Sequence, residues 1–263
     1  MLMHATRILI GCALVGVTIA CDGATAPGDS RVSLSFSGTR PSGAAAAFDA
    51  GPGGVTADAV GDSLTITDGT NTLVITRVEI VAREIELRRA GVASCDSSAA
   101  TDDCEYFSVS ARLVALPLAP GATQVLSVDL PAGTYSSLRM KVHKVSDDAG
   151  DLAFLAANPA WPEDQSIRVT GFYNGAAFTY LSDVNFDAEE ELQPSLVVDA
   201  VAAVNLTVRL DLSLWFRTGG IGPLINPATA GPSGVNKSVV ENNIKNSVRV
   251  FEDDDRDGDE RDG

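Results

Sequence analysis

The last residues of the chain, "FEDDDRDGDERDG", carry acids at the spacing that calcium loops use. Asp253, Asp255, Asp257 and Gly258 reproduce the opening Asp-x-Asp-x-Asp-Gly of such a loop, in which alternate carboxylates converge because the glycine allows a sharp turn. The twelfth position, which should supply a bidentate glutamate, falls one residue beyond the last residue of the sequence. The acids that could lend oxygens in its place are Asp259, Glu260 and Asp262.

The same stretch also reads as an ordinary acidic tail. Residues 252–263 hold eight acids and two arginines, and a chain terminus must lose entropy to order around an ion. Such a tail could also rest on the basic stripe of Arg139, Lys141 and Lys144. The sequence therefore favours a disordered acidic tail without a cofactor, and weak calcium binding is the alternative.

A second acidic cluster, "FDAEEELQP", offers carboxylates for acid and base chemistry. Paired carboxylates can hydrolyse glycosides, and Asp187, Glu189, Glu190 and Glu191 lie close together in the sequence. Consecutive acids on an extended segment alternate between its two faces, however. We therefore expect a solvated segment here.

Nucleophilic catalysis is tested by the block "GDSL" at residues 61–64, which spells the nucleophile motif of a large esterase family. Such an enzyme needs a histidine base that an aspartate orients. The only histidine after residue 20 is His143, which lies mid-chain in "RMKVHK" with no aspartate three residues before it. The sequence predicts a strand at Ser63 and a solvated strand face at His143, with no esterase.

The first residues, "MLMHATRILIGCALVGVTIAC", have the layout of an export signal. Arg7 precedes an apolar run from Ile8 to Ile19, which is too short to span a bilayer, and a small residue precedes Cys21. This order resembles a bacterial lipobox, whose cysteine becomes lipid-modified. We predict a signal peptide over 1–20, lipidation of Cys21 and a tether over 21–30. Plain secretion and an uncleaved anchor are the alternatives.

The remaining cysteines agree with export. Once the signal peptide and the lipidated cysteine are set aside, Cys95 and Cys104 form an even pair in "SCDSSAATDDCEYF". An exported chain keeps such a pair as a disulfide, and too few other ligands are present to complete a zinc shell. We predict a disulfide between Cys95 and Cys104.

The formal net charge of the chain is −16 at pH 7. Binding to nucleic acid or to anionic lipid depends on Lys and Arg that neutralise phosphate. The charge therefore excludes a nucleic-acid partner, and a lipid anchor would supply the contact with a membrane.

The body of the chain shows the two-residue period of β-strands. In "NLTVRLDLSLWF", residues 205–216, apolar and polar residues alternate throughout, which predicts one dry and one wet face. Turn signals such as Asp68-Gly69 and Asn174-Gly175 separate similar runs. These runs predict one antiparallel β-sandwich over 31–217, interrupted by a low-complexity loop over 38–62 without fixed structure. Trp215 and Phe216 end the clearest strand, where core packing is favoured over a sugar-stacking platform.

A change of period follows the sandwich. Apolar residues at helical spacing, together with a Ser238 and Glu241 capping box, predict a short helix within residues 218–251. The helical face is formed by Val240, Ile244, Val248 and Phe251. We expect this helix to pack on the sandwich and the acidic tail to begin at residue 252.

Four stretches together look like a family of uncharacterised bacterial lipoproteins with a β-sandwich body. They are "LTITDGTNTLVITRVEIVAREIEL", "DLPAGTYSSLRMKVHK", "IRVTGFYNGAAFTYLSD" and "LSLWF…INPATAG…VENNIKNSVRVFEDDDRDG". This resemblance implies export and an all-β fold, and it transfers no catalytic residue. The sequence thus predicts a membrane-anchored, non-catalytic surface module of the cell envelope with a binding or structural role. Its ligand is not identified, and a glycan and an envelope protein are the candidates. A glycan-directed hydrolase with a carboxylate site is the alternative.

Overall fold

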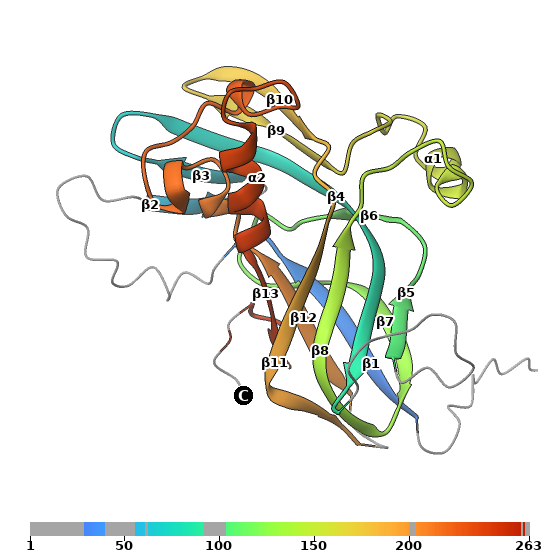
Figure 1. Cartoon of the computed structure of the whole chain (residues 1–263). Helices are drawn as coiled ribbons and strands as arrows, with labels where there is room; N and C mark the ends of the chain where they lie inside the picture. The colour runs from blue at the N-terminus through green and yellow to red at the C-terminus, as the bar shows by residue number, and fades with distance from the viewer. Residues whose placement is uncertain are drawn as a thin grey trace, which may run out of the picture.

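A computed structural model describes residues 29–39, 56–60, 63–91, 104–199, 203–258 and 260. These residues form a four-stranded and a nine-stranded β-sheet with few helices, which confirms the predicted all-β sandwich (Figure 1). The signal peptide predicted over 1–20, Cys21 and Cys95 lie outside the described residues.

The smaller sheet has the strand order β13-β12-β1-β7. Its strands are β1 (Asp29–Ser37), β7 (Thr123–Pro131), β12 (Val204–Leu210) and β13 (Val248–Glu252). β1 pairs antiparallel with β7 and parallel with β12, and β12 pairs antiparallel with β13. β1 and β12 are therefore the inner strands of this sheet.

The larger sheet is built around β4 (Thr72–Arg89), which Figure 1 shows running the length of the molecule. The other strands are β2 (Thr56–Val60), β3 (Ser63–Thr67), β5 (Cys104–Ser108), β6 (Arg112–Ala115), β8 (Gly133–Val142), β9 (Ile167–Tyr173), β10 (Ala176–Ser182) and β11 (Phe186–Val198). The first half of β4 pairs with β3 and β9, its middle pairs with β6, and its second half pairs with β5 and β8. Register shifts interrupt these pairings, so β4 is a long, bulged strand.

The core lies between the two sheets. Alternate residues of β1 (Val32, Leu34 and Phe36) and of β8 (Leu138, Met140 and Val142) are buried there. The turn predictions also hold, since Asn174 and Gly175 have the positive φ angles of 49° and 81° that a type I′ hairpin requires. The hydrophobic alternation that predicted these strands therefore also identifies the residues of the core.

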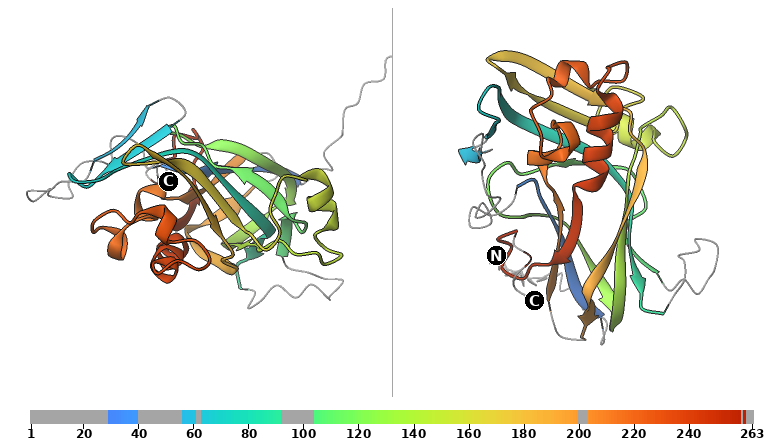
Figure 2. Two further views of the ribbon diagram at one scale, coloured as in Figure 1. Left: turned by 90° about the horizontal axis from the view of Figure 1, so that it is seen from above. Right: turned by 60° about the vertical axis from the view of Figure 1, so that its left-hand side comes forward.

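In the described part of the chain, two α-helices and three short 3₁₀ turns lie outside the sheets. The α-helices are α1 (Leu152–Ala157) and α2 (Lys237–Asn246), and the turns are η2 (Leu212–Leu214), η3 (Thr218–Gly220) and η4 (Pro227–Thr229). Figure 2 shows α2 and the turns grouped together on one side of the body. The predicted capping box is wrong, because the N-cap is Asn236 and it makes no side-chain cap hydrogen bond.

Three boundaries differ from the sequence prediction. The loop predicted over 38–62 contains β2, which pairs with β3. The strand predicted over 205–216 ends at Leu210, because Asp211 caps η2 through the backbone N–H of Ser213. The predicted helical face ends early: Val248 and Phe251 belong to β13, so the sandwich includes residues beyond 217.

None of the helices in the described part of the chain is both long enough and apolar enough to cross a membrane.

Candidate metal centre

The three aspartates of the predicted calcium loop come together directly after β13. One carboxylate oxygen from each of Asp253, Asp255 and Asp257 lies within 4.8 Å of the other two. Asp253 is 0% exposed, whereas Asp255 and Asp257 are exposed. The cluster thus combines one buried carboxylate with two exposed ones.

Asp253 is held by the strand next to it. Its backbone N–H donates to the carbonyl of Asn205 on β12 at 2.9 Å, which extends the pairing of β13 with β12 by one residue. Its Oδ2 accepts from the hydroxyl of Thr207 at 2.7 Å and from the backbone N–H of Gly258 at 3.2 Å. Its Oδ1 is buried and has no hydrogen-bond partner. A buried carboxylate oxygen without a partner is costly unless a cation compensates it.

Tight turns fold residues 254–258 back over Asp253. Arg256 and Gly258 have φ angles of 61° and 80°. The carbonyl of Arg256 accepts from the backbone N–H of Ala122 at 3.0 Å, which fastens the turn to the loop before β7. The backbone N–H of Asp257 donates to Oδ1 of Asp255 at 3.1 Å. The glycine of the motif is therefore used as the sequence predicted, at a turn that brings the acids together.

Both faces of β12 are buried, so the expected wet face is wrong. Residues 253–258, which we call the C-terminal segment, contact the polar side of this strand through Asn205 and Thr207. Arg209, on the same side, forms an ion pair with Glu260. The residues predicted as a solvated face are the surface on which the segment is fixed. The tail predicted from residue 252 thus begins with ordered residues.

Electrostatics at the cluster favour a bound cation. Burial raises the pKa of Asp253, the hydrogen bonds from Thr207 and Gly258 lower it, and the charges of Asp257 and Asp255 raise it again, so that the net shift is upward. Three converging carboxylates repel one another, and oxygen ligands of this kind suit Ca²⁺. Among the acids expected to lend further oxygens, Glu260 binds Arg209, and residues 259 and 262 lie outside the described part of the chain.

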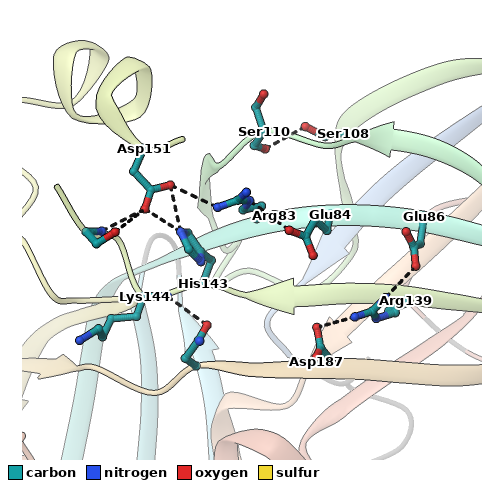
Figure 3. Close-up of polar contacts among 12 residues, drawn as sticks. Arg83, Glu84, Glu86, Ser108, Ser110, Arg139, His143, Lys144, Asp151 and Asp187 are labelled. Atoms are coloured by element: carbon teal, nitrogen blue, oxygen red, sulfur yellow. Dashed lines mark hydrogen bonds and ion pairs between the residues drawn. The ribbon is translucent and has the colours of Figure 1, made fainter. Parts of the chain in front are cut away.

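The second acidic cluster does not form a pair of free carboxylates. Asp187, Glu189 and Glu191 lie on β11, where arginines of β4 and β8 pair with them. Arg139 bridges Asp187 and the buried Glu86, as Figure 3 shows. Glu190 lies 3.9 Å from Arg249, and burial raises its pKa. These acids therefore form ion pairs with arginines of neighbouring strands.

The basic stripe is also engaged elsewhere. Arg139 pairs with Glu86 and Asp187, and Lys144 pairs with Asp164 at 2.8 Å. The C-terminal segment contacts β12 on the other sheet. The stripe is therefore not where the described part of the segment rests.

His143 is not on a solvated face as the sequence predicted. It is 8% exposed, and its Nε2 lies 2.8 and 2.9 Å from the two carboxylate oxygens of Asp151 (Figure 3). Asp151 also accepts from the backbone N–H of Ser146 at 3.0 Å and lies 3.7 Å from Arg83. These contacts of Asp151 hold the loop before α1 in place. Of the two residues considered for an esterase, Ser63 begins strand β3 and His143 is bonded to Asp151.

The other predicted positions are structural. Trp215 and Phe216 are buried in the core, which confirms core packing over a sugar-stacking platform. Cys104 is buried at the start of β5. Its pairing with Cys95 stays a prediction because Cys95 lies outside the described residues.

Sequence reasoning missed Thr207, Asn205 and Asp151. Thr207 and Asn205 alternate with apolar residues and therefore read as solvent-facing. Their partner Asp253 lies 46 residues from Thr207 in sequence, so no local pattern joins them.

No family model matches the chain, and comparisons with curated proteins and with solved structures find no match either.

Proposed function

We propose that the chain is an exported, lipid-anchored and non-catalytic module of the cell envelope whose β-sandwich binds one Ca²⁺ at Asp253, Asp255 and Asp257. The observation that carries the calcium site is the unpartnered Oδ1 of Asp253, a 0% exposed residue within a cluster of three carboxylates. The proposed export and anchoring rest on the export signal and on Cys21, and a disulfide between Cys95 and Cys104 would agree with export.

Arginines on the second acidic cluster support a non-catalytic role. A glycosidase needs one carboxylic acid to give a proton and one free carboxylate to act as base or nucleophile. Asp187, Glu189 and Glu191 each lie in an ion pair with an arginine. The arrangement favours a binding or structural module over the glycan-directed hydrolase.

The affinity we expect is that of an extracellular site. Calcium sites of extracellular modules bind with dissociation constants of about 10⁻⁴ to 10⁻³ M, which matches an ion that two exposed carboxylates and one buried carboxylate hold. An ion of this affinity is bound outside the cytoplasm and has a structural role, because it fixes the C-terminal segment on β12.

Calorimetric titration with CaCl₂ tests the site. We expect one site in the wild-type protein and no measurable binding in Asp253→Asn. The matched control is Asp254→Asn, which removes the same charge from an exposed residue outside the cluster and should bind as the wild type does. Equal binding by the wild type and Asp253→Asn, or none by the wild type, would contradict the proposal.

Mass spectrometry of the protein from a membrane fraction tests the anchor. We expect an N-terminus at Cys21 with added acyl mass, and no free thiol at Cys95 or Cys104. An unprocessed or unmodified N-terminus would overturn the anchoring part and leave the calcium site untouched.

A further inference from the structure

A directional chain of hydrogen bonds runs across β1 and β12 and ends at the calcium cluster. The hydroxyl of Ser35 donates to Oδ1 of Asn205 at 2.8 Å. The amide nitrogen of Asn205 donates to the hydroxyl oxygen of Thr207 at 3.3 Å and to the carbonyl of Asp253 at 2.8 Å. Thr207 then donates to Oδ2 of Asp253 at 2.7 Å. All four residues are buried.

The hydrogen bonds at Thr207 can run in only one direction. The hydroxyl of Thr207 already accepts from Asn205, so its own proton is directed at Asp253. Oδ2 of Asp253 receives a second donor, the backbone N–H of Gly258. With Oδ2 occupied twice, the carboxylate cannot rotate freely, and Oδ1 is the oxygen left for an ion.

We propose that Thr207 is the positioning residue of the calcium site: it fixes the carboxylate of Asp253 so that Oδ1 is presented beside Asp255 and Asp257. The proposal rests on the calcium site proposed above. Partners that orient a metal ligand typically change metal affinity by about 10- to 100-fold when they are mutated. Thr207 contributes no oxygen to the cluster itself.

The position is unusual for a site that lies at the end of the chain. Thr207 is 0% exposed on an inner strand of the smaller sheet, and it is 46 residues from Asp253 in sequence. The ion therefore depends on the pairing of β1 with β12. Conversely, an ion bound at Asp253 strengthens the contact of the C-terminal segment with these strands.

Three proteins separate positioning from packing: the wild type, Thr207→Val and Thr207→Ser. Valine keeps the volume and the branched shape of threonine but removes the hydroxyl, whereas serine keeps the hydroxyl. Each is titrated with CaCl₂ by calorimetry, and its thermal unfolding is measured in chelator. We expect a dissociation constant about 10- to 100-fold higher for Thr207→Val, with Thr207→Ser close to the wild type.

Different failures point to different parts of the account. If the wild type binds no calcium, the proposed function fails. If the wild type binds and Thr207→Val binds equally well, the positioning role fails while the site stands. If valine and serine weaken binding equally, the hydroxyl is not the cause, and the positioning role is again overturned.

A second variant keeps the test decisive if Thr207→Val does not fold. Ser35→Ala removes the first donor of the chain and leaves Thr207 and the cluster in place. We expect a weaker calcium affinity than in the wild type, by less than the change in Thr207→Val. An unchanged affinity in a folded Ser35→Ala protein would contradict the part of the proposal that extends to β1.

Discussion

Asp253 combines two properties that oppose each other in the absence of an ion. Its Oδ2 is bonded to Thr207 and Gly258, which stabilises the fold, while its Oδ1 is buried without a partner. Its carboxylate also lies near those of Asp255 and Asp257. If the proposed site holds a cation, we expect this residue to cost stability in chelator and to contribute stability when the cation is bound.

We predict that Asp253→Asn has opposite effects in the two conditions. Asparagine keeps an oxygen for Thr207 and places an amide donor beside Asp255 and Asp257. In chelator the variant should unfold at a higher temperature than the wild type, by a free energy of about 1 to 2 kcal/mol. In saturating calcium the order should reverse. Scanning calorimetry in both buffers measures this, and a variant that is less stable in both would contradict it.

The second residue-scale prediction concerns Asp151 and pH. Burial raises the pKa of Asp151, but the N–H of Ser146, His143 and Arg83 outweigh it and lower the pKa below 3.8. A carboxyl with a lowered folded-state pKa adds stability above its unfolded pKa, and that stability is lost as the pH falls through the folded value. The window therefore lies below about pH 5.

We expect Asp151→Asn to lower the free energy of unfolding at pH 7 by about 2 to 3 kcal/mol. The variant should also lose less stability than the wild type as the pH falls below about 5. The control is Asp147→Asn, an exposed acid of the same loop, which should behave as the wild type does. Urea unfolding in chelator at several pH values measures both effects. An equal acid response in Asp151→Asn would show that another group governs it.

Among the elements, α2 joins the C-terminal region to the rest of the molecule. Val240 and Ile244 are 0% exposed, and the amide of Asn243 donates to the carbonyls of Trp215 and Arg217 at 3.0 and 2.6 Å. The helix leads directly into β13 and then into the calcium cluster. Its packing therefore positions the strand that carries Asp253.

We predict that Ile244→Ala lowers the free energy of unfolding by about 2 to 5 kcal/mol, because it leaves a cavity under the helix. Val239→Ala on the same helix is the control. Val239 is 36% exposed, so its truncation should change stability by about 0.5 kcal/mol or less. Urea unfolding of the two variants compares them, and equal losses would mean that α2 is not anchored through Ile244.

The elements differ in how far the sequence could predict them. β8, the β9–β10 hairpin and the bulged β4 were predictable, because period-two alternation and the Asn174-Gly175 turn are local signals. β2 was missed because its low-complexity sequence carries no strand signal, and it forms by pairing with β3. β13 was read as helix because Val248 and Phe251 continue the helical spacing of α2.

The candidate site also contains features that the sequence could predict and features that it could not. The acids of the loop and its glycine were found from their spacing alone. The contacts that separate a solvated tail from an ordered segment were not, because Asn205 and Thr207 look solvent-facing until residues 253–258 cover them. A long-range contact of this kind is visible only in the folded chain.

At the scale of the whole molecule, the proposed calcium site would join β13 to β12 and, through Asn205 and Ser35, to β1. β1 begins at Asp29, close in sequence to the proposed anchor at Cys21, and ends at Ser37 beside the C-terminal segment. Ser35 of this strand donates to Asn205 beside the cluster, and it lies about 20 Å along the strand from Asp29 at roughly 3.3 Å per residue. The proposed ion would therefore be bound well along β1 from the first described residue of the strand, on the polar side of the smaller sheet.

A bound ion also acts on the charge of the molecule. The chain carries a formal net charge of −16, and the cluster gathers three negative charges around one buried position. A divalent cation offsets two of these charges and relieves repulsion where the segment meets the smaller sheet. Calcium is therefore expected to stabilise the native state as a ligand that binds the folded form.

The central claim is that Asp253, Asp255 and Asp257 hold a calcium ion against β12, and anomalous diffraction tests it most directly. Crystals of the protein grown with CaCl₂ are measured at a long wavelength, where calcium scatters anomalously. The account predicts a peak between the three carboxylates, next to Oδ1 of Asp253, that is absent from crystals of Asp253→Asn. Wild-type crystals without a peak at this position, or with calcium bound only elsewhere, would contradict it.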